Sequence, residues 1–472
     1  MFPQWIQKIW LVCGTLSVAM PAAAQGEAPA ATTPDAAPTV EAAPAGLFER
    51  DTLTDGWFGL APKLKDRGII LTATEISEVL GNVSGGLKTG AIYDGRLELD
   101  LDLDLGQLIG LDNSVFHASA YQIHGRGLSQ NNVGDNLLTV SSIEATRTIR
   151  LFDLWVERGF FDSALSIRLG QIAADDEFIT SQYTGNLLNS TFGWPAITAQ
   201  ALPGGGPVYP LAAPGIRVKG ALSNMFSLQA ALFDGNPAGQ SATADPQVAD
   251  SSGTSFDTTS TPFLIAEFAY MPAGGGEPSA QGTALKFGAW YQGGGFDDLA
   301  VDGNGRSLAA PASTGVPRSH SGDFGFYGIA DMLLYREPGT DDLGLGAFLR
   351  AGVAPADRNF VTFYADGGFA YKGLFAGRGD DIVSFGVSFV RISGQAERLI
   401  ETLQRFGADA HAPDYEAVIE LDYQATLAPW WTVQPDMEFV FHPTAPTVPT
   451  VTTPVPRIGN ALILGLRTSI RF

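Results

Sequence analysis

The sequence is poor in the features that stabilise small secreted domains or helical membrane proteins. Cysteine occurs once in 472 residues, at Cys13, which excludes a disulfide framework. No run approaches the ~20 consecutive apolar residues that a membrane-spanning helix needs. Positive charge is also scarce, because 28 Lys and Arg stand against 50 Asp and Glu, a formal net charge of -22. Without a basic stripe to neutralise phosphates, a nucleic-acid partner is excluded.

Catalytic and cofactor motifs are missing as well. No Gly-x-Ser-x-Gly motif accompanies the five histidines, and Gly204-Gly205-Gly206 lacks the Lys-Ser/Thr of a phosphate loop. His117 and His124 have opposite strand parity, so they do not resemble a zinc pair. An energy-coupled transporter would need a folded plug domain, and only residues 25–68 precede the first predicted strand. We therefore expect no enzyme, no metal and no cofactor.

What the sequence does contain is strict alternation. From Arg96 to Leu105 five leucines alternate with five charged residues. Only an extended strand has a side-chain period of two, so all five leucines fall on one face and all five charges on the other. The last twelve residues, ending at Phe472, repeat the pattern. One apolar and one polar face over this length predict an all-β protein, a transmembrane antiparallel up-and-down β-barrel.

From Ile69 onward the sequence contains sixteen strand candidates. An even number lets a closed antiparallel barrel begin and end on the same side of the membrane. The candidates are 69–80, 91–105, 114–124, 149–158, 163–172, 214–222, 224–234, 262–272, 282–293, 322–335, 342–354, 361–372, 380–392, 412–428, 430–442 and 459–472. Short turns on one side contrast with long loops on the other, as in porins, and the long loops are 125–148, 173–213, 235–261, 294–321, 393–411 and 443–458.

The register of each strand follows from the cost of charge in lipid. A Lys or Arg at mid-membrane costs roughly 2–4 kcal/mol, so charged residues must face the lumen. In the ninth candidate this puts Phe287 toward lipid, and Lys286 and Trp290 toward the lumen. The first candidate fits no single register because Glu75 and Glu78 have opposite parity, which predicts a bulge or an early strand end.

The chain divides into four segments. Residues 1–24 resemble a secretory signal, with Lys8 before an apolar core and three small residues at the cleavage site. Residues 25–46 form a linker rich in Ala and Pro, and 47–68 contain a short helix, bracketed by Pro62 and Gly68, that we expect at the periplasmic mouth. Residues 69–472 make the barrel. Export by the signal predicts an outer-membrane location.

Several segments occur in the order and spacing of one known family. They are Gly56-Trp57-Phe58-Gly59-Leu60, Leu154-Trp155-Val156-Glu157, Leu169-Gly170-Gln171, Ala174-Asp175-Asp176-Glu177-Phe178, Pro214-Gly215-Ile216-Arg217-Val218, Glu416-x-x-x-Glu420, Gln434-Pro435-Asp436, His442-Pro443 and Gly465-Leu466-Arg467. In this arrangement the chain resembles the carbohydrate-selective porins (OprB type) of Gram-negative outer membranes. The resemblance implies passive, selective diffusion of carbohydrates, glucose above all, through a narrowed aqueous pore.

A sugar-selective pore needs charged hydrogen-bonding groups beside an aromatic ring, because a sugar has hydroxyls on its edge and C–H groups on its faces. The strand parity predicts inward-facing candidates of each kind. The donors are Arg168, Arg217, Lys286 and Arg350, the acceptors are Glu98, Asp100, Glu157, Glu267 and Glu420, and the stacking ring is Trp290. For each residue the alternative is an ion pair of the lumen wall that only keeps the pore wet.

The longest connection, 173–213, is the candidate for narrowing the pore. It combines acidic residues, an aromatic residue and glycines, and the residues that we assign to the constriction are Asp175, Asp176, Glu177 and Trp194. A loop of ~40 residues in a compact barrel usually has a function or is disordered. We expect it to fold into the lumen, and the alternative is that it lies over the outside.

A general, cation-preferring diffusion porin is the competing interpretation, because the alternating aspartates that begin at Asp100 and the net charge favour cations in the lumen. The expected partners are carbohydrate solutes, outer-membrane lipid and lipopolysaccharide. The terminal Phe472 resembles the signal that barrel-assembly machinery reads, and it also fits an aromatic girdle. The sequence leaves the choice between a homotrimer and a monomer open.

Overall fold

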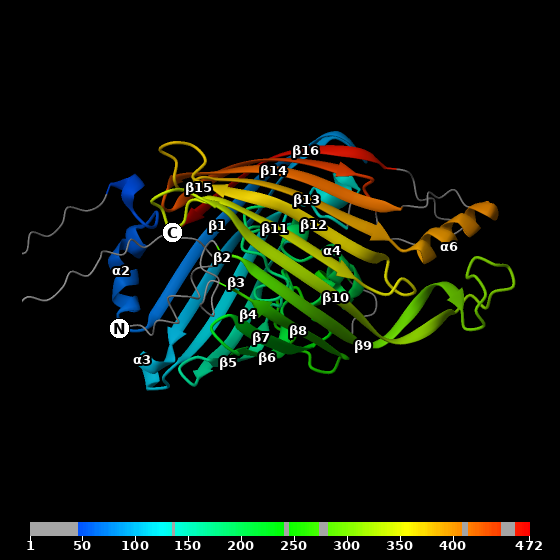
Figure 1. Cartoon of the computed structure of the whole chain (residues 1–472), viewed down its shortest axis with the longest axis horizontal. Coiled ribbons are helices and arrows are strands. Elements are labelled where there is room, and N and C mark those ends of the chain that lie inside the picture. Colours follow the sequence, from blue (N-terminus) through cyan, green and yellow to red (C-terminus); the bar gives the residue numbers. More distant parts are fainter. Residues whose placement is uncertain (1–45, 135–136, 240–244, 273–281, 408–413, 445–457) are drawn as a thin grey trace, which may run out of the picture.

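The computed structural model describes residues 46–134, 137–239, 245–272, 282–407, 414–444 and 458–472. These residues form one closed barrel in which each strand pairs antiparallel with its neighbours along the chain, and the first strand pairs with the last (Figure 1). The strands are β1 Ile69–Gly86, β2 Gly90–Asp104, β3 Ser114–Gly125, β4 Thr148–Phe160, β5 Leu165–Ile172, β6 Ala213–Ala221, β7 Phe226–Asp234, β8 Pro262–Tyr270, β9 Ala284–Asp302, β10 Pro317–Arg336, β11 Gly344–Val353, β12 Val361–Lys372, β13 Ile382–Ile392, β14 Tyr415–Ala428, β15 Trp431–Phe441 and β16 Gly459–Arg471. The predicted sixteen-stranded barrel is confirmed.

The helices are short and lie in the connections. They are η2 Leu47–Glu49, α2 Asp55–Lys65, α3 Leu105–Ile109, η3 Ser129–Val133, η4 Ser190–Phe192, α4 Ala196–Ala201, η5 Pro203–Gly205, α5 Pro246–Ala249 and α6 Gly394–Arg405. In the part of the chain that the structure describes, none of them has the length and apolar character needed to cross a bilayer. The predicted signal at 1–24 and all but the last residue of the 25–46 linker lie outside the described residues.

The predicted helix near Pro62 begins earlier than the sequence indicated. In α2, residues 56–59 have left-handed backbone angles, and the right-handed turns follow after Gly59. Pro62 therefore lies near the start of the right-handed part, where its missing N–H costs least. Trp57 Nε1 donates to the carbonyl of Phe472 at 3.2 Å, which holds the segment against the end of the chain.

The two faces of the strands have the predicted sidedness. Leu99, Phe287 and Tyr291 are exposed on the outer surface, whereas the alternate residues Trp290 and Gln292 are buried inside the barrel. Because these apolar side chains stand on the outside of the barrel, their exposed surface is the surface that lipid covers.

The expectation of a bulge or an early end in the first strand was wrong. β1 pairs with β2 without a break from Ile69 to Asn82, and the register shift lies farther on, against β16. Glu78 is buried inside the barrel, and Glu75 faces outward. Glu75 Oε1 accepts a hydrogen bond from Ser77 at 2.9 Å and lies 3.3 Å from His124 Nε2 on β3. These local partners let a carboxylate remain on the outer face without a break in the strand.

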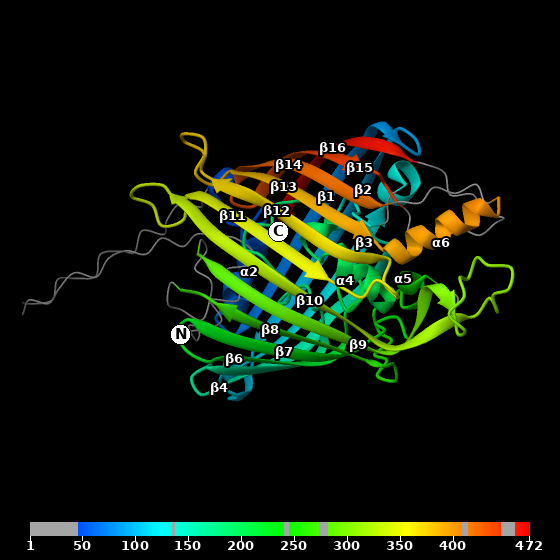
Figure 2. The ribbon, with the colours of Figure 1, turned by 45° about the vertical axis from the view of Figure 1, so that its right-hand side comes forward.

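The two ends of the barrel differ. The C-terminus and α2 lie at one end, and the long β9–β10 hairpin and α6 project from the other (Figures 1 and 2). The predicted loops 294–321 and 393–411 thus contain structure, because β9 and β10 extend into the first and α6 forms in the second. Leu399 and Leu403 of α6 pack against Ala300 of β9, which gives the amphipathic helix its apolar partner.

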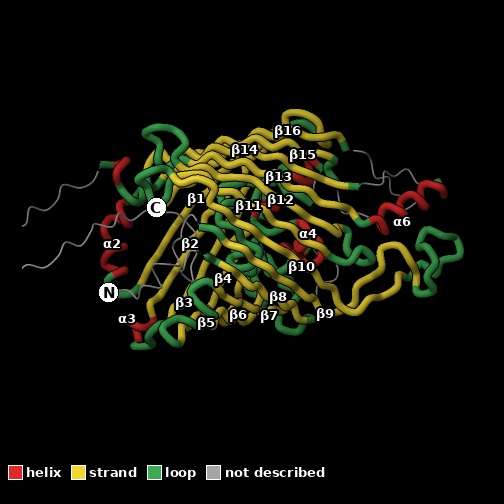
Figure 3. The backbone as a smooth tube through the Cα atoms, in the orientation of Figure 1, coloured by secondary structure: helices red, strands yellow, loops and turns green. Residues whose placement is uncertain are grey.

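The buried core lies inside the barrel. Residues 173–212, which we call the inner loop, connect β5 to β6, and α4 of this loop lies within the barrel (Figure 3). Leu187, Phe192 and Ile197 of the inner loop share an apolar cluster with inward-facing Phe348 and Tyr364. The inner loop therefore has two kinds of neighbour, the barrel wall on one side and the open lumen on the other.

Candidate functional site

Inward-facing carboxylates of three strands accept hydrogen bonds from the inner loop. Glu267 on β8 accepts from the backbone N–H of Ile179 at 3.1 Å. Asp331 on β10 accepts from the backbone N–H of Gln182, also at 3.1 Å. Glu420 on β14 accepts from the backbone N–H groups of Leu188 and Asn189. These carboxylates satisfy loop donors that would otherwise be buried without a partner.

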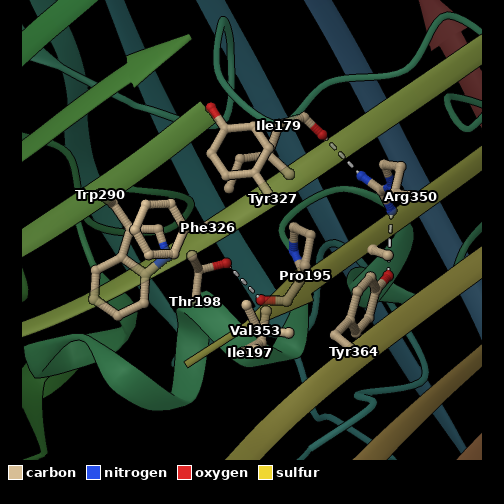
Figure 4. Close-up of a pocket in the computed structure, with 12 residues that line it drawn as sticks. Ile179, Pro195, Ile197, Thr198, Trp290, Phe326, Tyr327, Arg350, Val353 and Tyr364 are labelled. Atoms are coloured by element: carbon tan, nitrogen blue, oxygen red, sulfur yellow. Dashed lines mark hydrogen bonds between the residues drawn. The ribbon is translucent and has the colours of Figure 1, made fainter. Parts of the chain in front are cut away.

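Basic side chains satisfy the carbonyl groups of the same loop. Arg350 on β11 is 1% exposed and donates to the carbonyls of Ile179, Thr191 and Gly193 at 2.9, 3.0 and 3.2 Å (Figure 4). Its Nε lies 3.1 Å from Asp366 on β12, so the buried charge is paired. On β9, Lys286 Nζ donates to the carbonyl of Thr180 at 2.8 Å. The wall thus carries the donors and acceptors that this loop backbone needs.

Two arginines and two glutamates form a closed ion network where the loop leaves β5. Arg168 Nε and Arg217 Nη2 each lie 2.8 Å from Glu157 Oε2, and Glu177 Oε1 of the inner loop lies 3.1 and 2.7 Å from the same two arginines. Burial by itself raises the pKa of the Glu177 carboxyl, but the charges of Arg168 and Arg217 outweigh it and lower the pKa to about 2. Glu177 therefore stays ionised, and the network is balanced in charge.

The two predicted tryptophans are buried. Trp290 is 4% exposed and lies beside Ile197 and Tyr327 in a small apolar cleft between the inner loop and the wall (Figure 4). Trp194 is 7% exposed, and its Nε1 donates to the carbonyl of Gly205 within the loop at 3.2 Å. Trp290 does face inward as predicted, but the loop covers its ring.

A second set of inward-facing residues includes side chains that are accessible from the lumen, and we call it the open face. Arg96, Glu98, His117, Tyr209 and Asp176 are partly or fully exposed there, whereas Tyr121, Trp155 and Arg168 are buried. The open face is formed by the inner surfaces of β2 to β5 and by two residues of the inner loop. Arg96 lies over the rings of Tyr121 and Tyr209, with its Cζ 4.5 and 4.9 Å from the ring centroids. Arg96 Nη2 lies 2.8 Å from Glu98 Oε2, and the Tyr121 hydroxyl donates to the other oxygen of Glu98 at 3.5 Å.

The open face continues along the same strands. His117 Nδ1 lies 2.8 Å from Asp102 Oδ1, and the His117 ring stacks on Trp155 with 4.7 Å between centroids. Arg168 covers the Trp155 ring, with its Cζ 3.7 Å from the centroid. Asp176 of the inner loop is exposed to the lumen. Burial of its surroundings raises the pKa of the Asp176 carboxyl, and the charge of Arg168 opposes that shift.

The predicted site residues therefore separate into two groups. Glu98, Asp100 and Asp176 lie on the open face, and Arg168 joins that face to the ion network. The others hold or belong to the buried part of the inner loop, and they are Glu157, Arg217, Glu267, Lys286, Trp290, Arg350, Glu420, Asp175, Glu177 and Trp194. The sequence analysis missed Arg96, Tyr121 and Tyr209. Arg96 shares the parity of Glu98 and could have been found from it, whereas nothing in the sequence places Tyr209.

Comparisons with known proteins give a family and a fold for this chain. The family model described as carbohydrate-selective porin, OprB family, matches residues 88–472. Porin B of Pseudomonas aeruginosa is 23% identical over 436 residues, which cover 88% of this chain and 90% of the relative. The high-pH structure of Pseudomonas putida OprB matches with a TM-score of 0.79 at 23% identity over 91% of this chain and 100% of that one. The low-pH structure matches with a TM-score of 0.54 at 19% identity over 90% and 99%.

Proposed function

This chain belongs to the carbohydrate-selective porin family OprB, and on that basis we propose that it selects glucose and similar sugars during passive diffusion across the outer membrane. Selection takes place at the open face, where the inner loop narrows the lumen. The observation that carries the proposal is the group formed by Arg96, Glu98, Tyr121 and Tyr209, in which a guanidinium, a carboxylate and two aromatic rings lie in contact beside the lumen.

This combination of groups matches the chemistry of a sugar. A guanidinium donates to sugar hydroxyls, and a carboxylate accepts from them, in charge-assisted hydrogen bonds that are stronger than neutral ones. An aromatic ring offers an apolar surface to the C–H face of the sugar. Arg96 and Glu98 are partly exposed, with side chains 14% and 24% accessible, so they reach solute, unlike Arg350 or Glu420. The buried residues of the inner loop act indirectly, by holding Tyr209 and Asp176 at the open face.

Conductance in planar bilayers tests the proposal. Glucose added to a single channel should lower the ion current by saturable binding, and the lactose-sized disaccharides should block less. Arg96→Ala and Glu98→Gln should raise the half-blocking glucose concentration by at least about tenfold, the equivalent of one lost charged hydrogen bond. Arg405→Ala, which removes an exposed arginine from α6, is the matched control and should leave the block unchanged. An unchanged block in both open-face variants would refute the assignment.

A general, cation-preferring pore is the second candidate. It is favoured by the excess of carboxylates on the open face, where Glu98, Asp100, Asp102 and Asp176 outnumber Arg96 and Arg168. A ring or row of carboxylates attracts cations and disfavours anions. The same bilayer experiment separates the candidates, since current through such a pore would be cation-selective and insensitive to glucose. Liposome swelling across monosaccharides and disaccharides provides an independent measurement.

A further inference from the structure

The inner wall formed by β14 and β15 brings carboxylates face to face. Glu420 lies directly across from Glu438, and Asp422 lies directly across from Asp436. All four side chains are buried inside the barrel. Like charges directly opposite each other in a sheet are destabilising, so something must relieve the repulsion between these two pairs.

On the neighbouring pair of strands, β1 and β16, an arginine side chain offsets the charge of a similar buried carboxylate. Glu78 on β1 lies directly across from Arg467 on β16, and the two form an ion pair. Arg467 is directed to Glu78 and to Ser142. Across the described ranges, no lysine or arginine forms an ion pair with Glu420, Asp422 or Asp436. The charge of Arg467 acts on Asp422 and Asp436 only through space, because its direct ion pair is with Glu78.

The buried carboxylates of this wall include oxygens that accept no hydrogen bond, and Asp436 is the clearest case. Among the residues that the structure describes, neither carboxylate oxygen of Asp436 has a hydrogen-bond partner, although the residue is only 5% exposed. Oδ2 of Asp422 has no hydrogen-bond donor other than the neighbouring Glu420 carboxyl group, and its Oδ1 accepts from Gln434 at 3.0 Å. One oxygen each from Glu420, Asp422 and Asp436 lies within 4.8 Å of the others. Gly465, opposite Asp436, makes space for the Asp436 carboxylate, since a Cβ at position 465 would lie only 2.8 Å from Asp436 Oδ2.

We propose that Glu420, Asp422 and Asp436 bind a calcium ion inside the barrel. Carboxylate oxygens are the ligands that hard divalent cations prefer, and a divalent cation supplies the positive charge that offsets these carboxylates. Calcium binds oxygens at about 2.3–2.6 Å in flexible geometry, so one ion bridges oxygens separated by up to about 4.8 Å. Magnesium binds at about 2.0–2.1 Å, demands near-ideal octahedral geometry and loses its water reluctantly, so it suits a cluster of protein carboxylates less well. Water from the lumen completes the coordination shell.

The site is joined to the inner loop through one of its ligands. Glu420 accepts from the backbone N–H groups of Leu188 and Asn189, and Glu438 accepts from the Asn189 side chain at 2.8 Å. Each carboxylate oxygen has two lone pairs, so Glu420 can bind the ion and the loop together. Bound calcium therefore stabilises the wall to which the inner loop is attached, and it raises the resistance of the folded barrel to unfolding.

Isothermal titration calorimetry of the full chain in detergent micelles, stripped with EDTA and without sugar, tests the site. Titration with calcium chloride should give one saturable site with a dissociation constant on the order of 10⁻⁴ M, comparable to extracellular calcium modules. Magnesium chloride should bind at least about tenfold more weakly. Because no sugar is present, the outcome does not depend on the proposed function.

Three variants make the result specific. Asp436→Asn and Asp422→Asn should each weaken calcium binding at least about tenfold. Asp94→Asn is the matched control, because Asp94 is also a buried aspartate without a hydrogen-bond partner in the described chain, lies across from Glu78, and is outside the group of three. It should bind calcium within about threefold of the native protein. Heat-modifiable mobility in gel electrophoresis establishes that each variant is folded.

Two results would overturn the site. The absence of saturable calcium heat in the folded native protein would mean that the carboxylates share protons instead. Equal weakening in Asp94→Asn and Asp436→Asn would mean that calcium responds only to the overall negative charge of the lumen.

Discussion

The inner surface of this barrel has two regions with similar residues and different roles. On the wall of β8 to β14, charged side chains such as Glu267, Arg350 and Glu420 are buried under the inner loop and bind its backbone. On the open face of β2 to β5, Arg96 and Glu98 remain accessible to water. In both regions the strand alternation directs these side chains toward the inside of the barrel. The difference between them teaches that inward parity alone does not decide whether a lumen-facing charge is buried by the inner loop or remains accessible.

The largest expected effect is that of Arg350→Ala on the loop-bearing wall. The substitution leaves Asp366 buried without its partner and removes donors from three loop carbonyls. Removing one partner of a buried pair lowers the free energy of unfolding by about 3–5 kcal/mol. Denaturant unfolding of the folded barrel in lipid vesicles measures this loss, with Arg405→Ala as the control that stays within about 0.5 kcal/mol. An unchanged midpoint would mean that the wall does not hold the loop.

The next effect contrasts the two sides of one open-face strand. Leu99→Arg places a charge on the exposed apolar outer surface of β2 and should lower the free energy of unfolding by about 2–4 kcal/mol, depending on depth. Asp100→Arg, one residue along, puts the same side chain in the wet lumen and should cost at most about 1 kcal/mol. Both are measured by the same unfolding experiment. Equal costs would contradict the assignment of lipid and lumen faces.

A smaller effect on stability is expected on the open face itself. Arg96→Ala removes a partly exposed ion pair and two cation–π contacts, which together contribute about 1 kcal/mol. The same variant should weaken glucose block strongly, so function and stability separate at this residue. A loss of stability as large as that of Arg350→Ala would place Arg96 with the wall instead.

A pH-dependent effect is expected at the junction of the two regions, where Asp175 lies beside Asp176. Burial and the charge of Asp176 raise the pKa of Asp175 to about 7, whereas an unfolded chain releases this proton near pH 4. The folded state therefore binds the extra proton between about pH 4 and 7, and the free energy of unfolding declines as pH rises through that range. Unfolding at several pH values should show this slope in the native protein and a shallower one in Asp175→Asn. Identical slopes would contradict the raised pKa.

Much of the barrel could be predicted from the alternation of apolar and polar residues along the sequence. The alternation from Arg96 to Leu105 defines β2 and its two faces, and all sixteen predicted strands are present. Most agree with their predicted bounds to about three residues, but β1, β9 and β10 extend well beyond the predicted ends. The prediction failed in β1, where neighbouring side chains stabilise a carboxylate on the outer face of the strand. Glu75 indicated a break in β1, but a hydrogen bond from Ser77 and the nearby His124 let the strand continue. His124 is distant in sequence, so its contact with Glu75 is not readable from the first strand alone.

The candidate site could be predicted only in part. Parity correctly directs Glu98, Arg350 and Trp290 inward, yet only Glu98 remains on the open face. Tyr209 belongs to the inner loop and lies under the Arg96 guanidinium. Its position there depends on the contacts that the inner loop makes with many strands. No periodicity governs such a loop, and so its residues could be named but not placed.

The sequence by itself determined the sidedness of each strand, because a period of two and the cost of charge in lipid leave one acceptable register. Closure of the barrel and its antiparallel order follow from short turns and an even number of strands. The tertiary structure alone decided which lumen-facing charges bind the inner loop, which meet water and which carboxylates gather on β14 and β15. Those outcomes depend on hydrogen bonds and charge pairs between residues hundreds of positions apart, and local pattern carries no record of such contacts.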